Sequence, residues 1–278
     1  MTKPLLILLV GFAVNALAQE LPPIDWDELG KTAPWETTEI HKDVPVVTPG
    51  ENGAPPSDAI ILFDGTDLSQ WSTTPFGEGV RMDRTEVFLK RYNADQSAKD
   101  AQPAAWTVED GAIVAGAKKG AIATRQAFGD MQLHIEWFIP KLEGKSGQQY
   151  GNSGIFLMGL YELQVLNSYQ NPTYANGQAG AIYKQHVPLV NACKPPEQWQ
   201  SYDILFTAPR FSDKGTVISP AKVTVLQNGV LIQYNAVIQG PTSFIGEPYY
   251  VPHPAKLPIV LQDHDNPVRY RNIWVREL

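Results

Sequence analysis

The chain has 278 residues, of which 43% are hydrophobic, so it can form one large β domain or two small ones with a sizeable core. Its formal net charge of -7 at pH 7 provides no basic surface for neutralising phosphates. Nucleic acid is therefore not expected as a partner, and a neutral or polar ligand is favoured.

The first 18 residues predict an export signal. Lys3 supplies the positive end, residues 5–14 form the apolar run, and Ala16-Leu17-Ala18 has the small-x-small pattern of a cleavage site. We expect the mature chain to begin near Gln19 and to be periplasmic or secreted. The apolar run is too short to span a bilayer, and no later segment has the ~20 apolar residues of a membrane helix.

Residues 19–57 are rich in Pro, Thr and acidic residues and predict a linker or a wrapping arm. Trp26 and Trp35 in this arm indicate local packing. Cys193 is the only cysteine, so no internal disulfide can form, and the core must supply the stability.

Residues 58–278 are expected to form a β domain, because short apolar runs alternate with turn signals. The predicted strands are 59–63, 112–114, 131–139, 155–158, 160–166, 201–207, 222–226, 230–232, 257–261 and 269–276. Asn228-Gly229 lies between two of these runs and is a strong hairpin signal. Only residues 85–98 favour a helix. We therefore predict an all-β sandwich of antiparallel sheets.

Two of the predicted strands combine an apolar face with a face that carries polar and acid/base side chains. Because side chains alternate along a strand, His134 and Glu136 share one face of the strand 131–139, and Glu162 and Gln164 share one face of the next. If both strands lie in one sheet, their side chains form a patch suited to acid/base chemistry on a sugar. The alternative is an ordinary solvated outer face.

The hairpin before Glu162 should bring Asn152 near the end of its strand, where flanking glycines allow a ligand to approach the backbone. The loop up to Tyr183 is rich in amides and aromatic rings, which suits either a sugar site or a plain surface loop. At the C-terminal strands, Gln262 and His264 share a face, and Arg271 can pair either with site acids or in structural ion pairs.

A divalent cation is a further possibility near the last strands. Asp263, His264 and Asp265 offer oxygen and nitrogen ligands, although a contiguous acidic turn is also common loop chemistry. The metal remains an open alternative at this point.

Several of these motifs together resemble the domain of unknown function 1080 family, also called the 3-keto-disaccharide hydrolase domain. The motifs that carry the resemblance are Leu62-Phe63-Asp64-Gly65, 133–137, 151–156, 161–166, 180–183, Gln262-Asp263-His264 and Arg271-Asn272-Ile273-Trp274. Relatives usually carry Asp at the position of Asn167. The resemblance implies a concanavalin A-like lectin/glucanase fold, a jelly-roll β-sandwich, over residues 60–278.

The resemblance also implies a reaction. A ketone at C3 of a glucoside acidifies the C2 proton, so a base can remove it and the glycosidic oxygen can leave C1. Glu162 or Glu136 would be the base and His134 or His264 the acid, while Asn152, Gln164, Tyr183, Gln262 and Arg271 would bind the sugar. The rivals are a two-carboxylate glycosidase, a carbohydrate-binding module on the same sheet, and a structural envelope protein.

Overall fold

The structure is a computed structural model that describes residues 23, 25, 27–28, 43–51, 53–73, 102–116 and 118–278. The chain divides into two units, Met1–Val46 and Val47–Leu278, and every strand of the described residues lies in the second unit. Residues 47–57, the last part of the predicted arm, belong to this unit and are called the strap below. The predicted signal peptide, Trp26, Trp35 and the predicted helix 85–98 lie outside the described residues.

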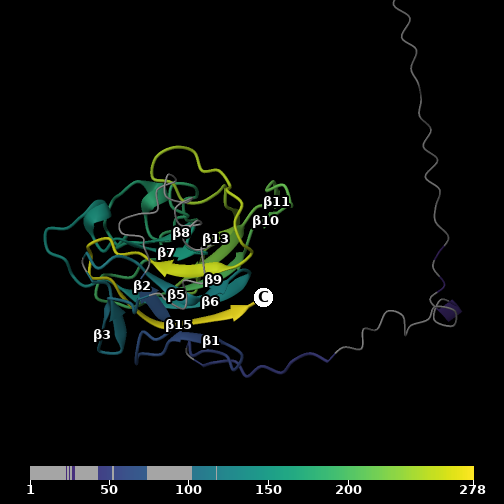
Figure 1. Cartoon of the computed structure of the whole chain (residues 1–278), viewed down its shortest axis with the longest axis horizontal. Coiled ribbons are helices and arrows are strands. Elements are labelled where there is room, and N and C mark those ends of the chain that lie inside the picture. The colour runs from purple at the N-terminus through teal and green to yellow at the C-terminus, as the bar shows by residue number, and fades with distance from the viewer. Residues whose placement is uncertain are drawn as a thin grey trace, which may run out of the picture. The chain divides into compact units, whose positions relative to one another are not determined.

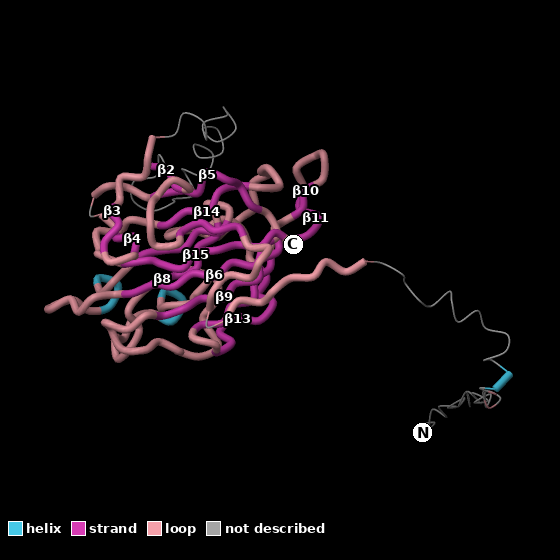
Figure 2. Tube along the Cα trace, turned by 90° about the horizontal axis from the view of Figure 1, so that it is seen from below, coloured by secondary structure: helices cyan, strands magenta, loops and turns pink. Residues whose placement is uncertain are grey.

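Apart from two short 3₁₀ helices, the regular elements in the described part of the second unit are strands (Figure 2). In chain order the elements are β1 (Ile60–Phe63), β2 (Trp71–Thr73), β3 (Thr107–Glu109), β4 (Ala112–Val114), β5 (Ile122–Phe128), β6 (Met131–Phe138), η2 (Gly147–Gln149), β7 (Ser153–Leu157), β8 (Tyr161–Val165), η3 (Ala175–Gly177), β9 (Gln200–Thr207), β10 (Arg210–Phe211), β11 (Val217–Ser219), β12 (Lys222–Gln227), β13 (Val230–Val237), β14 (Leu257–Leu261) and β15 (Arg269–Glu277).

The strands form two antiparallel sheets that pack face to face (Figure 1). The eight-stranded sheet has the order β13-β12-β9-β6-β15-β4-β3, with β1 paired to β15. The five-stranded sheet has the order β2-β5-β14-β7-β8, and β10 and β11 form a separate two-stranded ribbon. This architecture confirms the predicted all-β, concanavalin A-like jelly-roll sandwich.

Alternation of apolar and polar residues explains how the core forms between the sheets. On β6, Leu133, Ile135 and Trp137 are buried, as are Leu163 and Val165 on β8. Burying such side chains contributes roughly 1.5–3 kcal/mol each, which compensates for the absence of disulfides. The core therefore rests on hydrophobic packing, as the single cysteine predicts.

Most predicted strands are present, with ends shifted by a few residues. The Asn228-Gly229 hairpin joins β12 and β13, and the predicted antiparallel pair of β7 and β8 is also confirmed. Strand β5 was not predicted, because Arg125-Gln126-Ala127 at its centre lacks the β-branched and aromatic residues that mark a strand. Central strands of a buried sheet can tolerate such residues when their neighbours supply the pairing.

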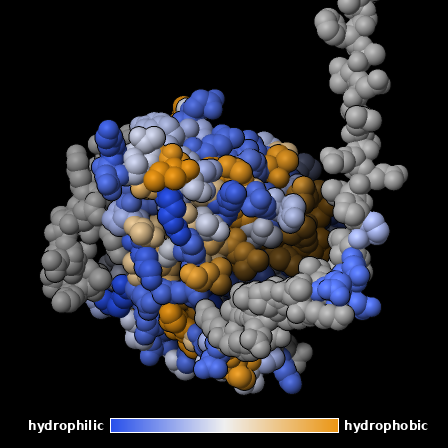
Figure 3. All heavy atoms as spheres, turned by 90° about the vertical axis from the view of Figure 1, so that its right-hand side faces the viewer, coloured by the Kyte–Doolittle hydropathy of each residue, from blue (hydrophilic) through white to orange (hydrophobic). Residues whose placement is uncertain are grey.

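The surface carries both polar and apolar residues. In the face shown in Figure 3, hydrophobic side chains gather in several patches separated by hydrophilic ones. Scattered apolar exposure of this kind is usual on folded domains. Among the described residues, no helix has the length and apolar character needed to cross a membrane.

Candidate functional site

The two predicted acid-bearing strands belong to different sheets: β6 lies in the eight-stranded sheet and β8 in the five-stranded sheet. Both strands turn their apolar side chains towards the shared core. Trp137 of β6 contacts Tyr202 with ring centroids 5.4 Å apart, and Tyr161 of β8 contacts Phe206 of the opposite sheet at 5.9 Å. The polar side chains of each strand consequently point away from the core.

His134 and Glu136 therefore lie on the outer face of the eight-stranded sheet, and Glu162 and Gln164 lie on the outer face of the five-stranded sheet. The prediction that they form one patch is wrong, because the core of the sandwich separates them.

On the five-stranded sheet, register brings a set of polar residues onto one face. Gly154 lies opposite Gln164, and Phe156 lies opposite Glu162. The backbone N–H of Gln262, just after β14, donates to the Gly154 carbonyl at 3.0 Å. Glu162, Gln164 and Gln262 are all buried. The structure thus brings together the predicted residues of β8 and of the end of β14.

Glu162 is the chemically unusual member of this cluster. Glu162 is only 5% exposed. Within the described residues, its carboxyl group has no recorded ion pair or hydrogen bond. Burial disfavours the carboxylate and raises the pKa of Glu162 to about 8. A carboxyl group with such a pKa exchanges its proton close to neutral pH, as an acid/base catalyst must.

Glycine at position 154 makes room for this carboxyl group. A Cβ atom on Gly154 would lie 2.6 Å from Oε1 of Glu162 and 2.8 Å from the ring of Phe156. Any larger residue would therefore displace the carboxyl group. Of the two glycines predicted to allow ligand approach, Gly154 accommodates the acid, whereas Gly151 lies against Ile139 with a φ of +72°.

Amide groups line the cluster beside Glu162. Nε2 of Gln164 donates to Oδ1 of Asn152 at 3.1 Å, and Nδ2 of Asn152 donates to the carbonyl of Gln148 at 2.9 Å. The carbonyl oxygens of the Gln164 and Gln262 side chains are buried and have no hydrogen-bond partner among the described residues. Buried orphan acceptors are costly, and a ligand hydroxyl would satisfy them.

Two loops form hydrogen bonds to the backbone of Glu162. Its carbonyl accepts the N–H of Tyr183 at 3.1 Å, and its own N–H donates to Oγ1 of Thr242 at 2.9 Å. The hydroxyl groups of Tyr183 and Tyr174 are 2.7 Å apart. Tyr183 thus lies beside Glu162. Thr242 and Tyr174, which were not predicted and which no short motif marks, also lie near it.

Hydroxyl groups on the core side anchor the floor of the cluster, from Tyr202 and Tyr270 of the opposite sheet and from Ser153 of β7. The Tyr202 hydroxyl donates to the backbone carbonyl of Gln164 at 2.9 Å. The Ser153 hydroxyl donates to the backbone carbonyl of Gln262 at 2.6 Å and accepts from the Tyr270 hydroxyl at 2.6 Å. Both site strands are therefore held to the core independently of their site side chains.

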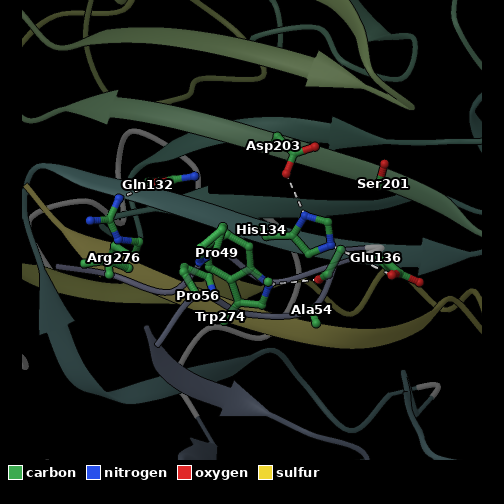
Figure 4. Close-up of a pocket in the computed structure, with 13 residues that line it drawn as sticks. Pro49, Ala54, Pro56, Gln132, His134, Glu136, Ser201, Asp203, Trp274 and Arg276 are labelled. Carbon is green, nitrogen blue, oxygen red and sulfur yellow. Dashed lines mark hydrogen bonds and ion pairs between the residues drawn. The ribbon is translucent and has the colours of Figure 1, made fainter. Parts of the chain in front are cut away.

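On the opposite face, His134 and Glu136 belong to a closed network of charges (Figure 4). Nδ1 of His134 is 2.6 Å from the Asp203 carboxylate, and its ring stacks on Trp274 with centroids 5.2 Å apart. Arg271 donates to Glu136 at 2.7 Å. The structure therefore does not place His134, Glu136 and Arg271 beside Glu162.

The same interactions set the protonation states of the network. Burial opposes a charge on His134, but its hydrogen bonds to Asp203 and Glu136 outweigh burial and raise its pKa to about 9. Burial likewise opposes the Glu136 carboxylate, but hydrogen bonds from His134, Asn272 and Arg271 lower its pKa to about 2. Both groups keep their charges near neutral pH and neutralise each other, so neither is poised to exchange a proton.

The network supports the strap. Asn272 donates to the Gly53 carbonyl at 2.8 Å, and Nε1 of Trp274 donates to the same oxygen at 3.3 Å. Strap residues and the network line a cavity of about 630 Å³. Figure 4 shows His134 between Asp203 and Glu136, with Pro49, Ala54 and Pro56 nearby. We therefore assign His134 and Glu136 a positioning role, because they contact Trp274 and Asn272, which hold the strap.

The remaining predicted residues lie after β14. His264 is exposed, and within the described residues no partner is recorded for its imidazole ring. Asp263 accepts the backbone N–H groups of Lys119 and Gly120 at 2.9 and 3.0 Å, so its carboxylate holds a loop. The described residues contain no group of three or more His, Cys, Asp or Glu side chains arranged to hold a metal.

Asn167 has a local structural role. Its side-chain oxygen accepts the N–H of Tyr169 at 3.1 Å, and its backbone carbonyl accepts Nδ2 of Asn171 at 2.6 Å. An aspartate could accept the same N–H. The difference from relatives at this position is therefore compatible with the same turn.

Residues 58–276 match the model of the 3-keto-alpha-glucoside-1,2-lyase-like domain. A crystal structure of a candidate glycosyl hydrolase from Parabacteroides distasonis is 44% identical, covers 88% of this chain and 96% of its own, and superposes with a TM-score of 0.75. A second such structure from that organism is 18% identical, covers 80% and 94%, and shares the fold with a TM-score of 0.52. No curated protein matches the chain. Because the family model spans most of the sequence, the chain belongs to the 3-keto-alpha-glucoside-1,2-lyase-like domain family.

Proposed function

We propose that the protein cleaves the glycosidic bond of 3-keto-glucosides, with Glu162 as the base that removes the C2 proton. The observation that carries this proposal is the buried Glu162 carboxyl group, whose pKa is raised to about 8 in a cluster of amides. Membership of the family supports a carbohydrate-active enzyme and the 3-keto-glucoside class.

The reaction is an elimination in two steps. The Glu162 carboxylate takes the proton from C2, and the C2–H electron pair forms an enolate with the C3 ketone. The enolate then expels the oxygen bound to C1, which takes up a proton and leaves as an alcohol. The ring keeps a double bond between C1 and C2, and addition of water there completes a hydrolysis.

The remaining site residues have roles that follow from their positions. The orphan side-chain oxygens of Gln164 and Gln262 accept hydrogen bonds from sugar hydroxyls, and Asn152 orients Gln164. With His134 on the opposite face, Tyr183 supplies the proton to the leaving oxygen, and Tyr174 orients its hydroxyl. A sugar bound here replaces missing hydrogen bonds instead of displacing existing ones.

The test is turnover of methyl 3-keto-α-glucoside by the purified full chain in D₂O. Elimination through C2 predicts deuterium at C2 of the hydrolysed product, whereas a two-carboxylate glycosidase leaves C2 unlabelled. Glu162→Gln should lower kcat/KM by about 10²- to 10⁴-fold. Glu247→Gln, which alters an exposed acid, is the matched control.

The pH profile distinguishes the two roles that Glu162 can take. A base must be ionised in the free enzyme, so kcat/KM should rise with pH and level off above about pH 8. A fall in kcat/KM above pH 8 would instead identify Glu162 as a proton donor. If the sugar binds without turnover, and Glu162→Gln changes affinity alone, the protein is a carbohydrate-binding module.

We also propose that the protein is exported. Support comes from the charged, apolar and small-residue pattern of residues 1–18. The N-terminal residue of the protein recovered from its source, measured by mass spectrometry, tests this: we expect Gln19, and a mature protein that keeps Met1 contradicts it.

A further inference from the structure

A chain of three side-chain amides runs from Gln148 in η2 to the site. Nε2 of Gln164 donates to Oδ1 of Asn152 at 3.1 Å and lies 3.5 Å from Oε1 of Gln148. Nδ2 of Asn152 donates to the backbone carbonyl of Gln148 at 2.9 Å and lies 3.4 Å from its Oε1. Gln148 therefore contacts the amide chain through two different oxygens.

Backbone carbonyls decide which way these amides point. The nitrogen and the oxygen of an amide side chain are similar in size, so the hydrogen-bond partners set its orientation. A backbone carbonyl can only accept a hydrogen bond. The Gln148 carbonyl therefore holds the nitrogen of Asn152, and the Gly177 carbonyl holds Nε2 of Gln148 at 2.7 Å. The side-chain oxygens of Asn152 and Gln148 must then face the nitrogen of Gln164.

This order leaves the side-chain oxygen of Gln164 on the side away from Asn152 and Gln148. The oxygen is buried and has no hydrogen-bond partner among the described residues. If the amide turned over, its oxygen would meet the oxygens of both neighbours and its nitrogen would lose both acceptors. The site therefore presents an acceptor at this position and cannot exchange it for a donor.

Gln148 is held in place without a ligand. Asn171 accepts the Gly147 N–H at 2.6 Å and donates back to the Gly147 carbonyl at 3.1 Å, so it fixes η2. Nε2 of Gln148 also donates to Oγ1 of Thr173 at 3.0 Å. The orientation of the Gln164 amide is consequently built into the fold, and the ligand does not have to induce it.

We propose, building on the function proposed above, that Gln148 is a positioning residue that makes the site select sugars by the hydrogens of their hydroxyl groups. It keeps the oxygen of Gln164 towards the ligand, where a hydroxyl group can donate to it. A fluorine atom in place of that hydroxyl leaves the oxygen buried and unpaired. The C3 ketone also has no hydrogen to donate, so it lies away from Gln164, and the donor is the hydroxyl at C2, C4 or C6.

Binding measurements with turnover removed test this selection. The Glu162→Gln protein is titrated calorimetrically with methyl 3-keto-α-glucoside and with its 2-, 4- and 6-deoxyfluoro analogues. At least one analogue should bind about 10- to 100-fold more weakly than the parent sugar, as expected for an unpaired buried acceptor. The ratio of the two Kd values is the fluorine penalty. Gln164→Met, added to Glu162→Gln, should remove the penalty for the analogue whose fluorine faces Gln164.

Variants of the amide chain test the role of Gln148. Gln148→Met, added to Glu162→Gln, keeps the length of the side chain and should lower the fluorine penalty by about threefold to tenfold, because Gln164 loses an acceptor. Gln148→Met together with Asn152→Leu should abolish the penalty, since the Gln164 amide can then turn. Gln149→Met alters the exposed neighbour and should leave the penalty unchanged. General damage to the site would instead weaken binding of the parent sugar and its analogues equally.

Equal binding of all four ligands, or binding of none, overturns the inference. A fluorine penalty that Gln148→Met leaves unchanged does the same, as does an equal effect of Gln149→Met. The proposed reaction can fail separately. If the wild-type protein binds methyl 3-keto-α-glucoside without turnover, but the fluorine penalty depends on Gln148, the reaction is wrong while the positioning role of Gln148 stands.

Discussion

Glu162→Gln should make the protein more stable at the pH values where it lowers activity. The buried Glu162 keeps its proton up to a pKa of about 8, whereas in the unfolded chain it ionises near its ordinary value of 4.5. Between these values the unfolded state loses a proton that the folded state keeps. Stability therefore falls as pH rises through this window, and glutamine, which does not titrate, removes that loss.

The magnitude follows from the width of the window. Each pH unit between about 4.5 and 8 costs the folded wild-type protein about 1.4 kcal/mol, and the accumulated cost is about 5 kcal/mol above pH 8. Below about pH 4.5 the carboxyl group is protonated in both states and costs nothing. The difference in unfolding free energy between variant and wild type should therefore grow from pH 4.5 to pH 8 and then stay constant.

Urea unfolding of wild type and Glu162→Gln at several pH values from 4.5 to 9 measures this difference. Other titrating groups cancel in the comparison, and a constant offset from the new amide does not affect the slope. Glu247→Gln, at an exposed site, should show no slope. A pH-independent difference for Glu162→Gln would refute the buried, unpaired acid on which the proposed function rests.

Three further predictions concern the two faces. Gly154→Ala should displace the Glu162 carboxyl group and lower kcat/KM by at least about 100-fold. Overpacking should also lower the free energy of unfolding, measured in urea, by about 1–3 kcal/mol. Full activity would contradict this prediction. The raised pKa of His134 stabilises the fold fully below pH 6.5, and this stabilisation is lost as pH rises through about 9. His134→Asn should therefore lower the free energy of unfolding by about 3 kcal/mol at most, and urea titrations should show this difference shrinking between pH 6.5 and 9. Asn272→Ala, which removes the donor to the Gly53 carbonyl, should speed amide hydrogen exchange in the strap and not around Glu162; equal acceleration at both places would show that the two faces are coupled.

The fold could be predicted in advance because its signals are local. Alternation along β6 and β8, the Asn228-Gly229 turn and the hairpin that ends in β8 are each encoded within about ten residues. Local patterns show which side chains share a face of one strand. They do not show which sheet the strand joins, since Leu133 and Leu163 give the same pattern on opposite sheets.

The composition of the site was predictable in part for the same reason. Gln164 and Asn152 meet because one hairpin joins them. Asp203 pairs with His134 from 69 residues away, and Thr242 reaches Glu162 from 80 residues away. Such partners depend on strand order, which a single sequence does not encode in any short motif.

Tyr202 and Ser153 hold the floor of the Glu162 cluster by its main-chain oxygens, and this has a consequence for protein engineering. Replacing the side chain of Gln164 or Gln262 leaves unchanged the backbone carbonyl that accepts the hydrogen bond from Tyr202 or Ser153. The amides that we propose to bind the sugar can therefore be exchanged in a mutant library while the strands beneath keep their positions. These positions can therefore be varied in a selection for a different sugar without destabilising the strands that carry them.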